Sequence, residues 1–165
     1  MRKLAAVLWC ALALSVHAQL AGNATWSTNR LASDASTTST TVVDSGWHVP
    51  VSASTTYEFE GWIWYSSTVN TATTMGLITD GTGPSIQSVW EATLADTTAV
   101  AYGFNVAGTT PTTSCCGSAS GDSVVHVIAK IATGTGATYV GINFKSTTGG
   151  TASLKAGSIM FFRVQ

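Results

Sequence analysis

Residues 56–66 read Thr56-Tyr57-Glu58-Phe59-Glu60-Gly61-Trp62-Ile63-Trp64-Tyr65-Ser66, and this stretch decides the fold of the 165-residue chain. Successive side chains of a β-strand point to opposite faces of its sheet. Tyr57, Phe59, Ile63 and Tyr65 therefore share one apolar face, and the glutamates and tryptophans share the other. We expect a long strand whose odd-numbered face lies on the core.

Several other segments show the same short, Val-, Ile- and Thr-rich character. The segments 124–132 and 137–146 predict a β-hairpin across the turn Thr133-Gly134-Thr135-Gly136, and 158–164 predicts a final strand after the turn at 154–157. Weaker candidates are 40–51, with Pro50 at an edge or bend, and 74–79, 88–94 and 100–106. Eight or nine strands with short links predict an all-β antiparallel β-sandwich, with a jelly-roll-like strand order.

The composition agrees with this fold class. Charged residues make up 9% of the chain and apolar residues 45%, and the Thr that fills much of the remainder suits a pleated, half-buried surface. We expect one domain over residues 19–165. The Ser/Thr-rich stretch 33–41 suits an edge strand or a linker.

Residues 1–18 form an apolar N-terminal segment that has two interpretations. Arg2 and Lys3, the apolar run to Leu14 and the small residues before Gln19 are typical of a secretory signal cleaved between Ala18 and Gln19. The alternative is a retained arm that packs on a neighbouring subunit or a membrane. Cleavage would leave Cys115 and Cys116 as the cysteines of the chain. Because adjacent cysteines form a strained ring with each other, an ordinary disulfide would join two subunits.

The sequence offers little chemistry, so we expect no enzyme and no cofactor. A net charge of -1 gives no basic field for nucleic acid, and no nucleophile motif such as G-x-S-x-G is present. His48 and His126 lie in separate strands without zinc-ligand spacing, so we expect half-buried strand histidines and no metal site. Asp80 begins a turn rather than a calcium loop. A cleft that joined either histidine to an acid would favour an enzyme.

The even-numbered face of residues 56–66 supplies the candidate binding residues. Glu58 and Glu60 lie on one face, at a spacing compatible with the two catalytic carboxylates of a glycosidase. Acids at such positions are more often simply exposed to solvent. Trp62 and Trp64 have three interpretations: a platform for sugar rings, an anchor at a subunit interface, or ordinary core between two sheets.

Residues 31–165 resemble a domain found in bacteriophage virion structural proteins. The resemblance is carried by Leu31-Ala32-Ser33-Asp34, by Val42-Val43-Asp44-Ser45-Gly46, by the residues from Val51 to Glu60, and by Leu154-Lys155-Ala156-Gly157-Ser158 with the strand that follows. It implies a β-sandwich that decorates a capsid or forms part of a fibre or tail, commonly as a homotrimer. It implies binding to other virion proteins, such as the major capsid protein, and transfers no site residue.

We therefore expect a virion structural protein, a capsid decoration or fibre-type subunit. The alternative is a secreted β-sandwich module that binds carbohydrate or another surface. The two differ in the fate of residues 1–18, because an export signal has no obvious use in a protein that assembles in the host cytoplasm.

Overall fold

The computed structural model describes residues 25–68, 73–93, 100–107 and 122–165, and every element that it assigns there is a β-strand. The strands are β1 Ser27–Arg30, β2 Ala35–Thr37, β3 Val43–Pro50, β4 Thr56–Ser67, β5 Thr73–Thr79, β6 Ser85–Thr93, β7 Val100–Ala107, β8 Ser123–Ala132, β9 Tyr139–Ser146, β10 Ala152–Leu154 and β11 Ile159–Val164. The signal-like segment 1–18 and both Cys115 and Cys116 lie outside the described residues.

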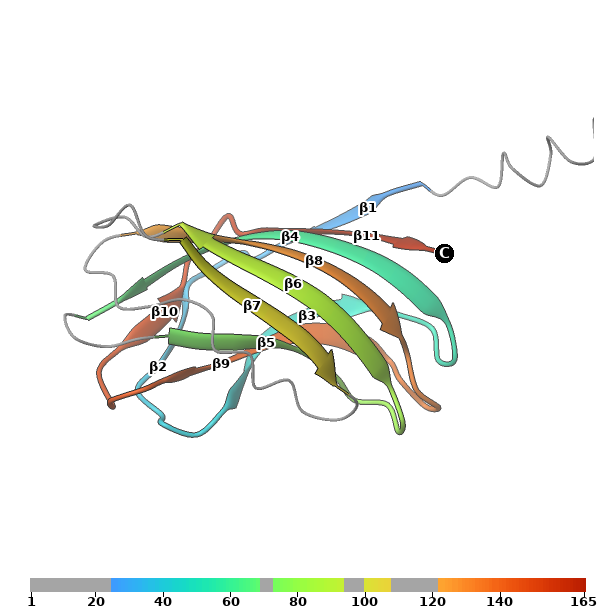
Figure 1. The fold of residues 1–165 in the computed structure, drawn as a ribbon, viewed down its shortest axis with the longest axis horizontal. Coiled ribbons are helices and arrows are strands. Elements are labelled where there is room, and N and C mark those ends of the chain that lie inside the picture. Colours follow the sequence, from blue (N-terminus) through green and yellow to red (C-terminus); the bar gives the residue numbers. More distant parts are fainter. Residues whose placement is uncertain (1–24, 69–72, 94–99, 108–121) are drawn as a thin grey trace, which may run out of the picture.

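The strands form two antiparallel sheets that face each other (Figure 1). The larger sheet has the order β1-β11-β4-β8-β6-β7, with β10 and β2 alongside, and the smaller has the order β3-β9-β5. The chain changes sheet at the links β2–β3, β3–β4, β4–β5, β5–β6, β8–β9 and β9–β10. Such alternation is typical of double-sheet jelly rolls, so the predicted antiparallel β-sandwich is confirmed.

Strand β4 lies between β11 and β8 in the larger sheet, and its odd-numbered side chains face the core, as its alternating sequence predicts. Tyr57, Phe59, Ile63 and Tyr65 are buried against the smaller sheet, whose own buried residues include Val49, Leu77 and Ile142. Gly61 continues this face because a Cβ there would lie 2.9 Å from a methyl of Val127. The apolar face of one strand thus fixes which side of the sheet becomes the core.

The predicted hairpin between residues 124–132 and 137–146 is wrong. Both segments are strands, but β8 pairs with β4 and β6 in the larger sheet whereas β9 pairs with β3 and β5 in the smaller. Because β4 and β6 occupy both edges of β8, no hydrogen-bonding edge remains for β9. Residues 133–138 therefore form a corner between the sheets, held by the Thr82–Thr135 bridge and by hydrogen bonds around the Thr133 hydroxyl.

Two short strands, β1 and β10, were not expected, and together with β2 in the stretch 33–41 they raise the count above eight or nine. β10 and β11 both pair with β4, one after the other along the same edge, and β2 and β1 pair with β10 and β11 in turn. Asp34 bridges the interruption by accepting hydrogen bonds from the Ala156 amide (2.7 Å) and Lys155 Nζ (3.0 Å). The two motifs that open and close the phage-like resemblance thus lie against each other.

Strand β2 falls within the Ser/Thr-rich stretch 33–41, so that stretch is an edge strand in part. Pro50 ends β3 at an edge of the smaller sheet, as expected of a residue without an amide hydrogen.

In the part of the chain that the structure describes, no helix has the length and apolar character to span a membrane.

Candidate functional site

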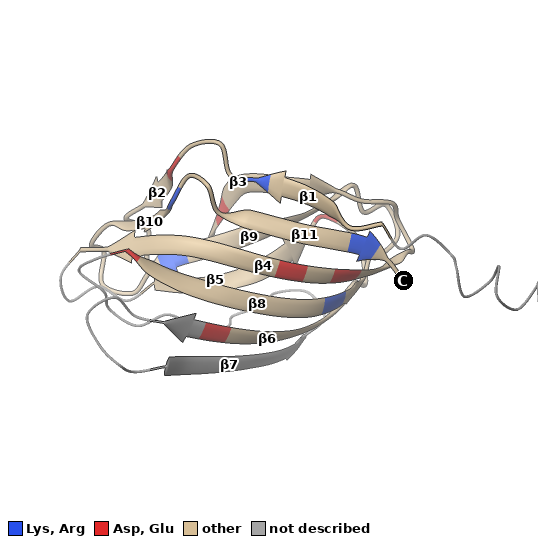
Figure 2. Ribbon diagram, turned by 90° about the horizontal axis from the view of Figure 1, so that it is seen from above, with Lys and Arg blue, Asp and Glu red and all other residues tan. Residues whose placement is uncertain are grey.

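The outer face of the larger sheet, turned away from the core, gathers the candidate site residues. We define the outer face as the outward side chains of β11, β4, β8 and β6 together with Trp26: Trp26, Glu58, Glu60, Trp62, Trp64, Gln87, Val89, Glu91, Val124, His126, Ile128, Lys130, Phe161 and Arg163. The antiparallel register aligns these side chains in rows across the strands. Figure 2 shows its charges, acidic on β4 and β6 and basic on β8 and β11.

Trp62 and Trp64 are exposed, at 39% and 40% of their surface, so they are not core residues. The smaller sheet covers the opposite face of β4, and the two tryptophans stay on the outside. This exposure rules out the interpretation that Trp62 and Trp64 are core residues buried between two sheets. Subunit interface and sugar platform both remain compatible with two exposed rings.

One row of the outer face is held by a charged pair. Glu58 accepts hydrogen bonds from the Arg163 guanidinium and from Gln165 Nε2, and Arg163 in turn lies 4.6 Å above the Trp26 ring. Cation–π contact of this kind orients both side chains. A groove of about 520 Å³ runs beside them, lined by Trp26, Glu58, Ile128 and neighbouring residues.

A second row is held by stacking. The rings of Trp62 and His126 lie nearly parallel, with centroids 4.1 Å apart, and His126 Nε2 is 2.9 Å from Glu60 Oε1. Glu91 faces His126 across the β6–β8 pair, and these residues line a hollow of about 140 Å³. Trp62 is therefore held in a defined orientation by its neighbour rather than being free to rotate.

Glu58 and Glu60 are partly exposed, and each contacts a basic side chain. Glu58 contacts Arg163 and Glu60 contacts His126. A glycosidase needs two carboxylates that flank the scissile bond, whereas these two serve to fix an arginine and a histidine. Their arrangement supports a role in shaping the outer face.

Between these rows lie the most exposed aliphatic side chains of the outer face. Val89 and Ile128 are opposite each other on β6 and β8, with 48% and 54% of their surface exposed. Sequence reasoning missed them, although alternation along 124–132 places Ile128 opposite the buried Val127 and Ala129. Trp26, Lys130 and Arg163 were also missed as members of this face, because their membership depends on which strands pair.

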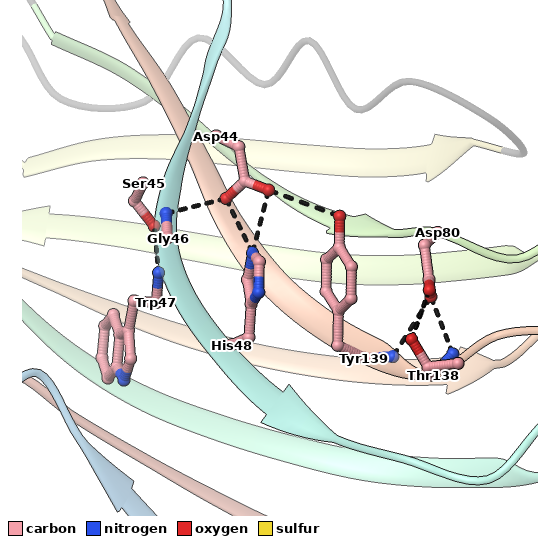
Figure 3. A network of polar contacts seen from close by, with 8 residues as sticks. All are labelled: Asp44, Ser45, Gly46, Trp47, His48, Asp80, Thr138 and Tyr139. Carbon is pink, nitrogen blue, oxygen red and sulfur yellow. Dashed lines mark hydrogen bonds and ion pairs between the residues drawn. The ribbon is translucent and has the colours of Figure 1, made fainter.

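A second polar cluster lies on the smaller sheet (Figure 3). Asp44 accepts hydrogen bonds from the Gly46 amide (2.9 Å), from His48 Nε2 (2.9 Å) and from the Tyr139 hydroxyl (3.3 Å), and the His48 ring stacks on Tyr139. Burial opposes ionisation of Asp44, but the hydrogen bonds from Gly46 and His48 outweigh it and lower the pKa of the carboxyl. Burial and the nearby Asp44 charge raise the pKa of Tyr139.

Asp80 belongs to the turn that the sequence predicted and acts as a structural cap. Its carboxylate accepts hydrogen bonds from the Thr138 hydroxyl, the Thr138 amide (2.8 Å) and the Tyr139 amide (3.1 Å). These bonds, the one from the Thr138 hydroxyl above all, lower the pKa of Asp80 to about 2. Asp80 thus ties the 80–84 turn to the start of β9.

Both histidines are half-buried strand residues, as predicted, and each contacts an acid. His48 pairs with Asp44 and His126 with Glu60. A hydrolytic triad also needs a nucleophile on the second imidazole nitrogen, and within the described residues no hydroxyl or thiol hydrogen-bonds to either ring. Over the same residues no group of three or more His, Cys, Asp or Glu side chains is placed to hold a metal ion.

Comparison with known proteins places the chain in no family. No family model matches it, and no curated protein does. Among solved structures, an Eiger TNF from S. frugiperda is 16% identical over 72% of this chain and 64% of that chain, with a TM-score of 0.33. Two structures of infectious bursal disease virus, of the Gt and Gx strains, are 10% and 9% identical over 87% and 85% of this chain, each with a TM-score of 0.24.

The chain spans 64% of the Eiger TNF chain and 42% and 39% of the two viral chains. These scores are too low to carry an argument about function.

Proposed function

We propose that the protein is a structural subunit of a virus particle, a capsid decoration or fibre-type protein of a bacteriophage, that assembles through its outer face. The observation that carries this proposal is the exposure of Trp62, Trp64, Val89 and Ile128 together on one sheet. Soluble monomers rarely leave a contiguous apolar surface uncovered. Stiff aromatic side chains ringed by polar groups are typical of the anchors of protein interfaces.

The role is one of binding rather than catalysis. Glu60 holds His126, which stacks on Trp62, and Glu58 holds Arg163, which lies over Trp26. Its partners are other virion proteins, such as the major capsid protein, and further copies of the chain. The phage-like resemblance implies a homotrimer located in the virion, and that copy number stays a prediction.

The double substitution Trp62→Ala and Trp64→Ala tests the proposal. We expect the variant to fold, because both rings are on the surface, but to sediment with particles at no more than about a tenth of the wild-type level, since interface anchors each contribute about 2 kcal/mol or more. Sedimentation of particles from the natural source, followed by quantification of the bound chain, makes the measurement.

Val42→Ala is the matched control, because Val42 is 40% exposed but lies outside the outer face. Normal incorporation of the double variant would exclude the outer face as the assembly surface.

Intact mass with and without reductant belongs to the same experiment: it reports whether residues 1–18 are retained and whether Cys115 or Cys116 joins two chains.

A second function is favoured by the hollow beside Trp62. There an oriented tryptophan ring, the His126 imidazole and the Glu91 carboxylate surround about 140 Å³. An aromatic face with adjacent hydrogen-bonding groups suits a sugar ring. Under this alternative the chain is secreted after cleavage between Ala18 and Gln19, and it binds carbohydrate as a monomer. Saturable quenching of tryptophan fluorescence by a sugar, lost in Trp62→Ala, would support it over the virion role.

A further inference from the structure

The groove of about 520 Å³ beside Trp26 is an apolar hollow in the outer face, and most of its lining is apolar surface. Val89 and Ile128, which are register partners on β6 and β8, both line it. Five of the seven large apolar side chains that are exposed in the described residues belong to the outer face, and three of those five line this groove. A contiguous apolar surface of this kind marks a site where a partner binds.

Residues 4–14 are the longest apolar run of the sequence, and they lie outside the described residues. The run contains four leucines, a valine and a tryptophan, and it carries no charge. In a chain that keeps residues 1–18, this run gains free energy by leaving water for an apolar surface, at roughly 25 cal/mol for each Å² that is buried. The groove of the outer face supplies such a surface.

The chain that precedes β1 starts at the groove itself. Trp26 lines the groove and stands immediately before β1. β1 runs antiparallel to β11, so the chain enters the larger sheet from beyond its end at Val164 (Figure 1). Residues 15–24, which connect the apolar run to Trp26, can span up to about 33 Å. Each copy therefore offers its apolar run and its groove at the same end of the larger sheet.

The direction of β1 favours the groove of a neighbouring copy over the copy's own. A chain that enters β1 along the strand, from beyond the end of the sheet, would have to reverse its direction to lie on its own outer face. A contact in which a segment of one copy fills a different site on the next is head-to-tail, and such contacts close into a ring when the successive rotations complete a full turn. A ring of three agrees with the homotrimer of the proposed function.

Charges on the outer face give the segment an orientation. Arg2 and Lys3 precede the apolar run, and residues 15–24 after it contain no Asp, Glu, Lys or Arg. Glu91 and Lys130 form no ion pair within the described residues, and they lie on opposite sides of the aliphatic centre of the groove, about 13 Å apart along the strands. A segment with its basic end beside Glu91 therefore gains an attraction there and sets uncharged chain beside Lys130.

We propose that residues 4–14 of a neighbouring copy occupy the groove of the outer face, with Arg2 and Lys3 beside Glu91, in a head-to-tail homotrimer. The inference rests on the proposed use of the outer face in assembly, and it names the partner that fills the groove. Trp62 and Trp64 lie outside the lining of the groove and stay available to other virion proteins. The apolar run supplies the buried core that an interface needs, and the opposite charges fix its orientation.

Disulfide trapping tests the contact on the full chain, because Cys10 lies within the apolar run. Cys115→Ser and Cys116→Ser remove the other two thiols. In that background Val89→Cys gives each chain one thiol in the run and one in the groove, so mild oxidation should link most chains into covalent dimers and trimers. Adding Cys10→Ser should abolish the linkage. Val42→Cys is the matched control, because Val42 is an exposed valine outside the outer face, and it should give little linkage.

Sedimentation equilibrium with reductant present measures the same contact without a cross-link. We expect the wild type to be a trimer. Leu8→Glu should raise its dissociation constant about tenfold or more, because the substitution puts a charge into an apolar contact. Gln19→Glu is the matched control, since it adds the same charge outside the apolar run, and it should leave the constant within about threefold of the wild-type value.

Four results would each overturn the inference: a disulfide within one chain in the Val89→Cys variant, no more linkage there than in Val42→Cys, a wild type that is monomeric, or a mature chain that begins at Gln19. If particle incorporation still depended on Trp62 and Trp64 in that case, the proposed function would stand, and the groove would bind a different virion protein. If the chains were linked as expected but incorporation did not depend on these tryptophans, the exchange would stand and the proposed use of the outer face in the particle would fail.

Discussion

Single side chains in this protein act mainly by fixing turns and neighbouring rings. Asp80 accepts hydrogen bonds from Thr138 and Tyr139 across 58 and 59 residues of sequence. Asp44 does the same for His48 and Tyr139, and Glu60 for His126. Five of the seven described side-chain carboxylates, those of Asp34, Asp44, Glu58, Glu60 and Asp80, accept a defined hydrogen bond.

Asp80→Asn should lower the free energy of unfolding by about 1 kcal/mol at neutral pH, since an amide replaces a charged acceptor at an exposed site. The folded pKa of Asp80, about 2, lies below the ordinary value of 3.8. Its contribution is therefore fully present above pH 3.8 and is lost as the pH falls towards 2.

Urea unfolding of wild type and variant between pH 2 and 7 checks this, and the two curves should converge at the acidic end. Asp122→Asn, at an exposed position just before β8, is the control. A constant difference across the whole pH range would contradict the assignment.

At the scale of elements, the corner between β8 and β9 determines the sandwich. A Cβ on Gly134 would lie 2.1 Å from the carbonyl oxygen of Thr82, because the 80–84 turn and the 133–138 corner pass in direct backbone contact. The glycine is required by this close approach rather than by an unusual backbone angle. This contact locks the point at which the chain leaves the larger sheet.

Gly134→Ala should therefore destabilise the fold by about 2–3 kcal/mol, since the backbone of one turn must shift to admit the methyl group. Thr135→Ala, at the neighbouring exposed position, should cost no more than about 0.5 kcal/mol. Chemical denaturation of the two variants makes the comparison. If Gly134→Ala were as stable as Thr135→Ala, the 80–84 turn and the 133–138 corner could move apart at little cost in free energy.

At the scale of the whole molecule, the outer face couples stability to assembly. A partner that binds the folded chain but not the unfolded one raises the midpoint of unfolding, and raises it further as concentration increases. An uncovered sheet bearing Trp62, Trp64, Val89 and Ile128 should therefore behave differently in dilute and concentrated solution.

The thermal midpoint of the wild type should rise by about 2 °C for each tenfold increase in protein concentration. The double substitution Trp62→Ala and Trp64→Ala should remove most of this dependence without changing the midpoint at high dilution. Scanning calorimetry over a hundredfold concentration range checks both expectations. A concentration-independent midpoint in the wild type would contradict assembly through the outer face.

The sequence by itself determined the strands whose alternation is strong, such as β4 and β8, and the side of β4 on which Glu58, Glu60, Trp62 and Trp64 lie. Period-two alternation is a local property, so the chain carries it without reference to its neighbours. Tertiary structure decided what the sequence left open: that β8 pairs with β4 and β6 instead of β9, that Trp62 and Trp64 stay uncovered, and that Glu60 meets His126 from 66 residues away. Sheet partners are chosen by burial and free hydrogen-bonding edges over the whole molecule, and no window of sequence contains that information.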